Sequence, residues 1–425
     1  MAGYGAASRL SSEGRNPIIF EKNNYLGGHT TSFYFEGGYI FDDGPHISFT
    51  NDERIQKIFA ESVKGEYETI KAYVNNYWKG QWIKHPAQCN LYGLPNDLVV
   101  KILLEFSQLE ANNLKINNYE DWLKASYGKV FAETFPMEYG FKYHTTEASN
   151  MSIDWLGPRL YQPDLEEVIR GALSPSTPEV HYVSNFRYPT HNGFVSYLNP
   201  LPSLANIKIN HKAIEIDADS KTIKFKNGTI EKYDSIISSI PLTELIPIIK
   251  QVPKNIVEAA SKLACTQCVV VNIGLDRSDI SEATWSYFYD RDIIFTRLSF
   301  PHMLSPNNVP DGKGSIQAEI YFSEKYKPID KSIDNCIKTT ITDLKRCGLI
   351  KEDDNITFKN GWLIPYAQVI FDLERKKSLK IVRDYLDEIK ISVCGRYGEW
   401  EYFWTDESFI SGENAAQRVL DSSKA

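Results

Sequence analysis

The sequence has little of what usually reveals a protein's compartment or partners. Its 425 residues include only 6 cysteines, too few for a disulfide framework, which favours a reducing compartment. No apolar run reaches the roughly 18 residues that a membrane-spanning helix needs, and no charged segment followed by an apolar one opens the chain. We therefore expect a cytoplasmic protein without a transmembrane segment, for which peripheral contact with a membrane stays open.

A dense block of positive charge is also absent. The formal net charge is -8 and the isoelectric point is near 5.6, and lysine and arginine are scattered along the chain. This distribution argues against nucleic acid as a partner. Cys265 and Cys268 have the one suggestive cysteine spacing, but no second pair follows, so we expect a structural role for them and no metal site.

The N-terminal stretch contains most of a dinucleotide-binding unit and lacks the rest. Residues 3–12 are typical of a helix of small residues able to press against a sheet, residues 18–20 of a wholly apolar strand, and residues 27–28 of a glycine turn. No strand precedes the helix, and of the G-x-G-x-x-G glycines only the third remains, as Gly3. We hypothesise that Met1 is an internal or wrongly assigned start, or that the chain was shortened, which sequencing of the upstream DNA would test.

The residues after this strand suit a nucleotide. Glu21, at the carboxyl end of the strand, can accept hydrogen bonds from ribose hydroxyls. Residues 27–30 can bring backbone N–H groups close to a phosphate without side-chain interference. A hairpin over residues 33–41 then delivers the chain to a Gly-Pro-His corner at residues 44–46, which suits close approach to a flat ligand.

Farther along, the sequence alternates between helical and strand-like patterns. Apolar residues at a helical spacing over 97–110 indicate a core helix. Alternation over 207–216 predicts one strand, followed by a hairpin that turns at residues 227–228 and by a strand over 234–241. From residue 268 to about 390 the pattern is strand-rich, as in a mostly antiparallel sheet that could floor a substrate cleft.

The C-terminal stretch supplies a second half of the predicted site. After a strand near residue 392, a Gly395-Arg396 turn and Asp406, which opens a helix of small residues, can direct N–H groups and one carboxylate at a polyol and a pyrophosphate. Together with the N-terminal helix, the strand ending in Glu21 and the Leu-Gly-Gly-His turn, this stretch resembles one superfamily. That superfamily holds amine oxidases, protoporphyrinogen oxidases and UDP-galactopyranose mutases, all of which bind FAD.

The resemblance implies an α/β fold with a Rossmann-like FAD/NAD(P)-binding domain, a helical subdomain and a mostly antiparallel sheet substrate domain. Composition agrees with several subdomains, since 425 residues with 42% hydrophobic content exceed what one core usually supports. We assign residues 1–50, 185–267 and 391–425 to a discontinuous FAD-binding domain. Residues 51–184, which look helical and aromatic-rich, form a helical substrate-side domain, and residues 268–390 form the sheet domain.

The resemblance also implies roles for individual residues. The expected FAD-binding residues are Gly3, Glu21, Lys22, Gly27, Gly28, His29, Thr30, Gly44, Pro45, His46, Ala213, Gly395, Arg396 and Asp406. On the substrate side it implies that Arg187, Arg297 and Tyr402 bind substrate, and that His46, Arg187 and Arg297 are catalytic. Arginine chemistry suits such a task, because its planar fork pairs bidentately with phosphate or carboxylate and its charge needs a partner when apolar residues flank it.

The reaction is less well defined than the cofactor. Oxidases transfer hydride from substrate to flavin, whereas mutases use reduced flavin as a nucleophile on a sugar. Two departures weaken a mutase assignment: Ile364 stands where mutases have a tyrosine before a proline, and the segment just before Asp406 is shorter. We therefore expect an FAD-dependent oxidoreductase acting on a small molecule, with a nucleotide-sugar mutase as the alternative. A flavin-free remnant or binding protein is a second alternative.

Overall fold

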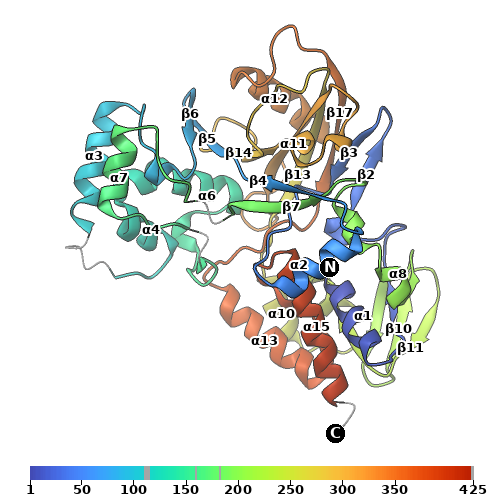
Figure 1. Ribbon diagram of the computed structural model, residues 1–425. Helices are drawn as coiled ribbons and strands as arrows, with labels where there is room; N and C mark the ends of the chain where they lie inside the picture. The colour runs from blue at the N-terminus through green and yellow to red at the C-terminus, as the bar shows by residue number, and fades with distance from the viewer. Residues whose placement is uncertain (110–114, 158–159, 181–182, 423–425) are drawn as a thin grey trace.

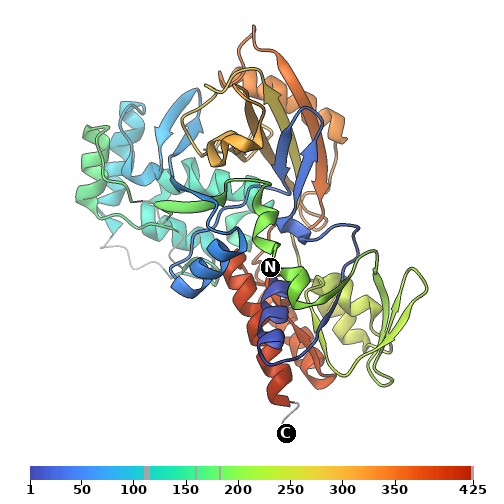
Figure 2. The same ribbon diagram turned by 45° about the vertical axis from the view of Figure 1, so that its right-hand side comes forward.

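The chain folds into three packed parts in the computed structural model, which describes residues 1–109, 115–157, 160–180 and 183–422 (Figure 1). A nucleotide-side part combines both ends of the chain, so that the blue N-terminal helix lies beside the red C-terminal helix in both views (Figures 1 and 2). A helical part and a sheet part lie above it in Figure 1. The main elements of each part are given next.

The nucleotide-side part contains α1 (Ala2–Ser12), β1 (Ile18–Phe20), β2 (Ser32–Phe35), β3 (Tyr39–Asp42), α2 (Glu53–Ser62), α8 (Leu201–Leu204), β8 (Asn206–Lys208), β9 (Ala213–Asp217), β10 (Thr222–Phe225), β11 (Ile230–Lys232), β12 (Ile236–Ser238), α9 (Leu242–Ile248), α10 (Lys254–Ser261), α13 (Arg375–Glu388), β18 (Ile391–Val393), α14 (Gly395–Glu399) and α15 (Thr405–Ser422). The helical part contains α3 (Asn96–Phe106), α4 (Tyr119–Tyr127), α5 (Lys129–Thr134), α6 (Pro136–His144) and α7 (Leu165–Leu173). The sheet part contains β5 (Val74–Trp78), β6 (Gln81–Lys84), β13 (Gln267–Leu275), β14 (Trp285–Phe288), β15 (Arg297–Ser299), α11 (Pro301–Leu304), β16 (Gly314–Phe322), α12 (Ile333–Arg346) and β17 (Ile356–Ile364). Between these parts, β4 (Tyr67–Lys71) pairs with β7 (Asn185–Pro189).

The contact between α1 and α15 depends on two glycines. A Cβ atom at Gly5 would come within 1.9 Å of the Phe409 carbonyl oxygen, and one at Gly412 would come within 1.9 Å of the Ala2 carbonyl oxygen. Helices approach this closely only where side chains are absent. The close packing expected for the N-terminal helix is present, and its main partner is α15 rather than a sheet.

Two short parallel strand pairs form the nucleotide side. β1 pairs with β8, and β12 pairs with β18. Among the described residues no strand joins the two pairs, and none precedes α1. The prediction of one strand over 207–216 is wrong, because β8 and β9 belong to different sheets; Asn210 between them has a φ of 59°, which ends the extended backbone.

The large sheet is mostly antiparallel, as predicted, in the order β17-β13-β16-β15-β14-β5-β6, with only β14 and β5 parallel. Every residue of β16 is buried, so this strand lies at the centre of the sheet core. Residues 67–84, expected within the helical domain, form β4, β5 and β6 instead. Their valine, isoleucine and aromatic residues favour a pleated surface, and two of these strands extend the sheet.

The helical part is held by its aromatic core. Phe131 and Phe135 are fully buried with Leu123. α3 confirms the helix expected near residues 97–110, and α7 begins with a capping box between Asp164 and Glu167, which satisfies backbone N–H groups at the first turn. Within the described ranges of the chain, no helix is both long and apolar enough to cross a bilayer.

One predicted domain boundary lies too late in the chain. α13, which ends before residue 390, packs against α10 and β18 of the nucleotide side rather than against the large sheet. Val382 and Leu386 of α13 are buried in the same core cluster as Ile256 of α10. The nucleotide side therefore begins its final segment at α13.

Candidate functional site

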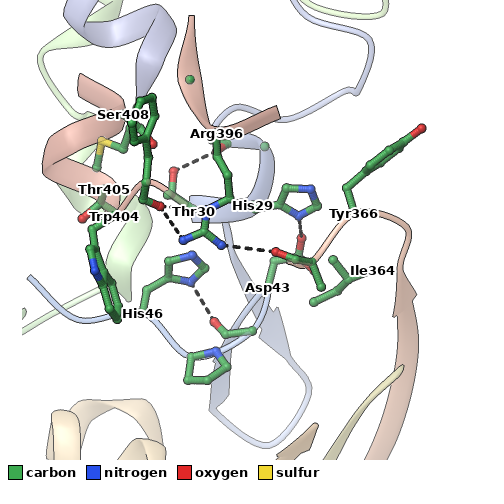
Figure 3. Close-up of a pocket in the computed structure, with 18 of the residues that line it drawn as sticks. His29, Thr30, Asp43, His46, Ile364, Tyr366, Arg396, Trp404, Thr405 and Ser408 are labelled. Carbon is green, nitrogen blue, oxygen red and sulfur yellow. Dashed lines mark hydrogen bonds and ion pairs between the residues drawn. The ribbon is translucent and has the colours of Figure 1, made fainter. Parts of the chain in front are cut away.

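A cavity of about 360 Å³ lies where the three parts meet, and we call it the main cavity. Its wall comes from the start of α1, the end of β1, the turn at residues 27–30, the corner at residues 43–47, and the starts of α14 and α15. Figure 3 shows side chains from these segments converging from both ends of the sequence. Its volume falls within the range of about 300 to 1,000 Å³ typical of ligand sites.

Glycines line part of the predicted nucleotide end of the main cavity. A Cβ atom at Gly3 or Gly28 would meet nothing within 4 Å, although both residues line the cavity. Gly27 and Gly28 have φ values of 111° and 54°, which favour glycine at both positions. These glycines leave open volume beside backbone N–H groups, as a bound pyrophosphate requires.

Glu21 lies at the end of β1, on the wall of the same cavity. Its Oε1 accepts a hydrogen bond from the Asn23 backbone N–H at 2.8 Å, which orients the carboxylate. A carboxylate oxygen beyond that bond can accept from ribose hydroxyls. The Glu21 carboxylate and the open glycine backbone therefore fit an FAD molecule whose adenosine lies beside Glu21.

Arg396 holds together two segments of the cavity wall by hydrogen bonds from its guanidinium. Its Nε donates to the Phe403 carbonyl at 2.8 Å, and its Nη1 donates to the Ala367 carbonyl at 3.2 Å and to Gln368 Oε1 at 3.1 Å. The arginine thus ties the segment before α15 to the loop after β17. Gly395 beside it has a φ of 77°, and a Cβ atom there would lie 2.8 Å from the Ala2 side chain, so the position favours glycine.

Two histidines that line the cavity, His29 and His46, lie near this arginine (Figure 3). Burial lowers the pKa of His46 to about 4, so its ring is neutral near pH 7. His46 Nδ1 lies 2.8 Å from the Gly44 carbonyl, which can only accept, so Nδ1 carries the proton and Nε2 is an acceptor. His29 Nδ1 lies 3.0 Å from Asp43 Oδ2, and Asp43 Oδ1 accepts from the Trp362 indole at 2.7 Å. Asp43 therefore joins the glycine turn to strand β17.

A buried ion pair lies at the sheet end of the main cavity. Arg297 on β15 stands opposite Glu319 on β16, and its Nη2 donates to Glu319 Oε1 at 2.9 Å while Nε bonds the other carboxylate oxygen. Tyr321 donates to Glu319 Oε1 at 2.7 Å. Glu319 balances the charge of the arginine, and no hydrogen bond joins Nη1 to a residue that the structure describes.

A second cavity of about 190 Å³ adjoins the first, and we call it the aromatic cavity. Most of its lining side chains are tyrosine, tryptophan or phenylalanine, from the helical part and the large sheet. The residues that line both cavities are Tyr143, Tyr287, Arg297, Tyr402 and Trp404. A ligand in the main cavity can therefore continue past Arg297 into the aromatic cavity.

Most of the predicted site residues come together in this arrangement. Those that line the main cavity are Gly3, Glu21, Gly27, Gly28, His29, Thr30, Gly44, Pro45, His46, Arg297, Gly395, Arg396 and Tyr402. Four others are not among its described lining residues. Three of them are Lys22, the residue after Glu21; Ala213, which begins β9; and Asp406, in the first turn of α15 between the lining residues Thr405 and Ser408. The fourth is Arg187.

Arg187 is the clearest correction. The pairing of β7 with β4 sets its guanidinium over the Tyr67 ring, 4.7 Å from the ring centroid, and Nη1 donates to the Gln56 carbonyl at 3.4 Å. It is absent from the described linings of both cavities. We predicted that Arg187 binds substrate. Instead it contacts Tyr67, because the pairing of β7 with β4 brings that ring next to its guanidinium.

The sequence reasoning missed several residues in and around the main cavity. Glu319 and Tyr321 on β16 and Trp362 on β17 were not singled out, although they hold Arg297 and Asp43. One signal was available, since Glu319 is the only charged residue in the run over 314–322. A buried charge requires a partner, and that partner is the predicted arginine.

Comparison with known proteins gives two family matches. Residues 1–62 match the NAD(P)-binding Rossmann-like domain, and residues 159–420 match the flavin containing amine oxidoreductase family. A solved structure of reduced UDP-galactopyranose mutase is similar to 99% of this chain and 94% of its own, with 27% identity and a TM-score of 0.92. The predicted superfamily and α/β Rossmann-like fold class are thereby confirmed.

Two more distant similarities show the shared fold. A protein of Exiguobacterium classed with the protoporphyrinogen oxidases covers 99% of this chain and 96% of its own, at 13% identity and a TM-score of 0.74. Putrescine oxidase bound to putrescine covers 99% and 97% respectively, at 13% identity and a TM-score of 0.64.

Proposed function

The chain belongs to the flavin containing amine oxidoreductase family, and from this membership we propose that it binds FAD in the main cavity and isomerises a nucleotide sugar. One observation carries the second half of the proposal. The similarity to UDP-galactopyranose mutase exceeds the similarities to the two oxidases in both identity and TM-score. The mutase alternative therefore moves ahead of the oxidoreductase that the sequence favoured.

The residues of the main cavity give each part of FAD a place. Glu21 would hold ribose hydroxyls, the backbone at Gly3 and Gly28 would approach the pyrophosphate, and the region of Arg396 and His46 would receive the ring system. FAD supplies a ring that can accept hydride or, when reduced, act as a nucleophile. Neutral His46 keeps Nε2 as an acceptor at that end of the cavity.

The substrate side supports an anionic and aromatic ligand. Arg297 lines both cavities. Its Nε and Nη2 atoms are bonded to Glu319, and its Nη1 would donate a hydrogen bond to a phosphate of the substrate. Beyond it the aromatic cavity offers ring faces for stacking. A nucleoside diphosphate sugar has a ring, a diphosphate and a sugar in the order that this path requires.

An oxidoreductase is the second candidate, because Ile364 lines the main cavity where mutases have a tyrosine. The deciding experiment incubates FAD-loaded protein with UDP-galactopyranose, with and without dithionite, and separates the products by chromatography. We expect the furanose form with reduced protein alone. Consumption of oxygen or a quinone with an amine or a porphyrinogen, and no furanose, would favour the oxidoreductase. Protein that takes up no FAD would indicate a binding protein or a flavin-free remnant.

A further inference from the structure

A short connection between α14 and α15, residues 400–404, helps to build both cavities. Tyr402 and Trp404 line both of them, and Phe403 lines the main cavity. The connection begins after α14 ends at Glu399 and stops where α15 begins at Thr405. A helix or a sheet supplies regular partners for backbone carbonyl groups, and a connection of this kind must find them elsewhere.

Two arginines from different helices bind the carbonyl groups of this connection. Arg396 donates from Nε to the Phe403 carbonyl at 2.8 Å and lines the main cavity. Arg375, the first residue of α13, donates from Nε to the Trp400 carbonyl at 3.0 Å, and its Nη2 bonds the same oxygen. This Nη2 also lies 2.6 Å from Glu401 Oε2. Arg375 is not among the described residues that line either cavity, so it acts on the connection from outside them.

The backbone of Trp400 is in a conformation that needs support. Its φ of 57° and ψ of 44° place it in the left-handed region, which residues other than glycine rarely adopt. The residue is fully buried, so its ring is anchored in the core. Arg375 is only 5% exposed, and its guanidinium lies 3.9 Å from the centroid of the Phe371 ring. The surroundings therefore fix an otherwise unfavourable turn, and this turn sets the direction in which the chain continues to Tyr402.

We propose that Arg375 is a positioning residue for the candidate site. By holding the Trp400 carbonyl, it sets where Tyr402 and Trp404 lie in the walls of the two cavities. The inference rests on the proposed function in one respect, since FAD is taken to occupy the main cavity. Lysine would replace this arginine only in part, because its ammonium group presents one nitrogen, whereas the guanidinium reaches the carbonyl with two and keeps a planar face for Phe371.

The first test needs no ligand. The Glu401 N–H donates to the Arg396 carbonyl at 2.9 Å, and the Trp404 N–H donates to Glu407 Oε2 at 2.7 Å, so both amides should be protected from hydrogen exchange. In FAD-free protein we expect Arg375→Met to speed exchange over residues 400–404 at least about tenfold. Arg375→Lys should speed it less, and it covers a methionine variant that does not fold. Unchanged exchange would overturn the proposal.

Arg277→Met is the matched control. Arg277 also donates to a backbone carbonyl, that of Leu349, and forms a two-bond pair with the Asp354 carboxylate. It lies just after β13 and is not among the described residues that line the two cavities. This variant should lose stability as Arg375→Met does, but exchange over residues 400–404 should stay as in the unmodified protein. Faster exchange there in both variants would show a general loosening of the fold and would overturn the proposal.

The second test measures FAD affinity by flavin fluorescence, at a temperature where circular dichroism shows every variant to be folded. We expect Arg375→Met to bind FAD about tenfold more weakly and Arg277→Met to bind it as before. In a protein that already carries Tyr402→Ala and Trp404→Ala, Arg375→Met should weaken FAD by less than about threefold, because residues that act through one another are not additive. An undiminished effect in that background would show that Arg375 does not act through these side chains.

The outcomes separate this inference from the proposed function. If the unmodified protein binds FAD and converts UDP-galactopyranose while Arg375→Met changes neither exchange nor affinity, the function stands and the role of Arg375 falls. If exchange quickens over residues 400–404 but FAD affinity is equal, Arg375 holds the connection without positioning the site, and the inference also falls. If exchange quickens and the unmodified protein binds no FAD, the hold of Arg375 on the connection stands and the proposed function fails.

Discussion

Two glycines of α1 stand two residues apart and should respond in opposite ways to the same substitution. Gly5 faces α15, where an added Cβ atom would lie 1.9 Å from the Phe409 carbonyl oxygen and 2.8 Å from the carbonyl carbon. Gly3 faces the main cavity, where an added Cβ atom would meet nothing within 4 Å. Alanine at Gly5 should therefore damage the fold, and alanine at Gly3 should damage the cofactor site.

The magnitudes follow from these distances. A contact of 1.9 Å with backbone cannot be relieved by a rotamer change, so Gly5→Ala must separate α1 from α15, and we expect a loss of about 3 kcal/mol of unfolding free energy. For a chain of 425 residues that corresponds to a fall in Tm of roughly 3 °C. Gly3→Ala should leave the Tm of the FAD-free protein equal or slightly higher, since alanine gains up to about 1 kcal/mol of helix propensity over glycine.

FAD binding should also distinguish the Gly3→Ala variant from the Gly5→Ala variant. The methyl group of Gly3→Ala would occupy the volume that we assign to the pyrophosphate, so we expect FAD affinity to fall at least about tenfold, equal to about 1.4 kcal/mol. Thermal unfolding by circular dichroism and FAD titration by flavin fluorescence measure the two effects on the same samples. Unchanged FAD affinity in Gly3→Ala would refute the placement of the cofactor, and an unchanged Tm in Gly5→Ala would refute the packing of α1 on α15.

Three further predictions concern charged and titratable groups. Arg297→Met leaves the carboxylate of Glu319, which is 4% exposed, without its ion-pair partner, and should lower the free energy of unfolding measured in urea by about 3 to 5 kcal/mol. Adding Glu319→Leu should recover most of this loss. A double variant no more stable than Arg297→Met alone would contradict the pairing. Glu21→Gln should weaken FAD about tenfold in calorimetry and leave FMN, which has no adenosine, unaffected, whereas equal losses would contradict the ribose contact. The folded-state pKa of His144, about 3, lies below its unfolded value of 6.5, so the unfolded chain takes up the proton first and stability is lost as pH falls below about 6.5. His144→Phe should therefore lose roughly 3 kcal/mol less than the unmodified protein between pH 7 and pH 4 in urea unfolding, and equal losses would show that His144 is not buried as a neutral ring.

Short local signals predicted the nucleotide end of the site well. The strand at residues 18–20, the glycine turn after it and the Gly395-Arg396 start of α14 all appear in the structure. Each depends on neighbours in sequence: apolar residues on a strand, glycine where φ is positive, and a glycine next to an arginine at the start of a helix. Such features can be recognised in one dimension because their causes are local.

The substrate side could not be predicted in the same way. Arg297 was expected to meet a ligand, but the adjacent strand brings Glu319 opposite it, and only the register of β15 with β16 decides that contact. Arg187 was expected in the same site, but β7 pairs with β4 and sets its guanidinium over Tyr67. A register shift of one residue would exchange the faces of these strands, and no local pattern encodes it.

The sequence by itself determined which cofactor class this protein is built for, because the glycines, the acid after the first strand and the C-terminal arginine have local causes. Tertiary structure alone decided what lies beyond the cofactor. The aromatic cavity is assembled from helices and strands more than 100 residues apart, as with His144 and Tyr287, and the unpartnered imidazole exists only because those elements close around it. Burial, pairing and the absence of a partner are properties of three-dimensional neighbours, which the order of residues does not display.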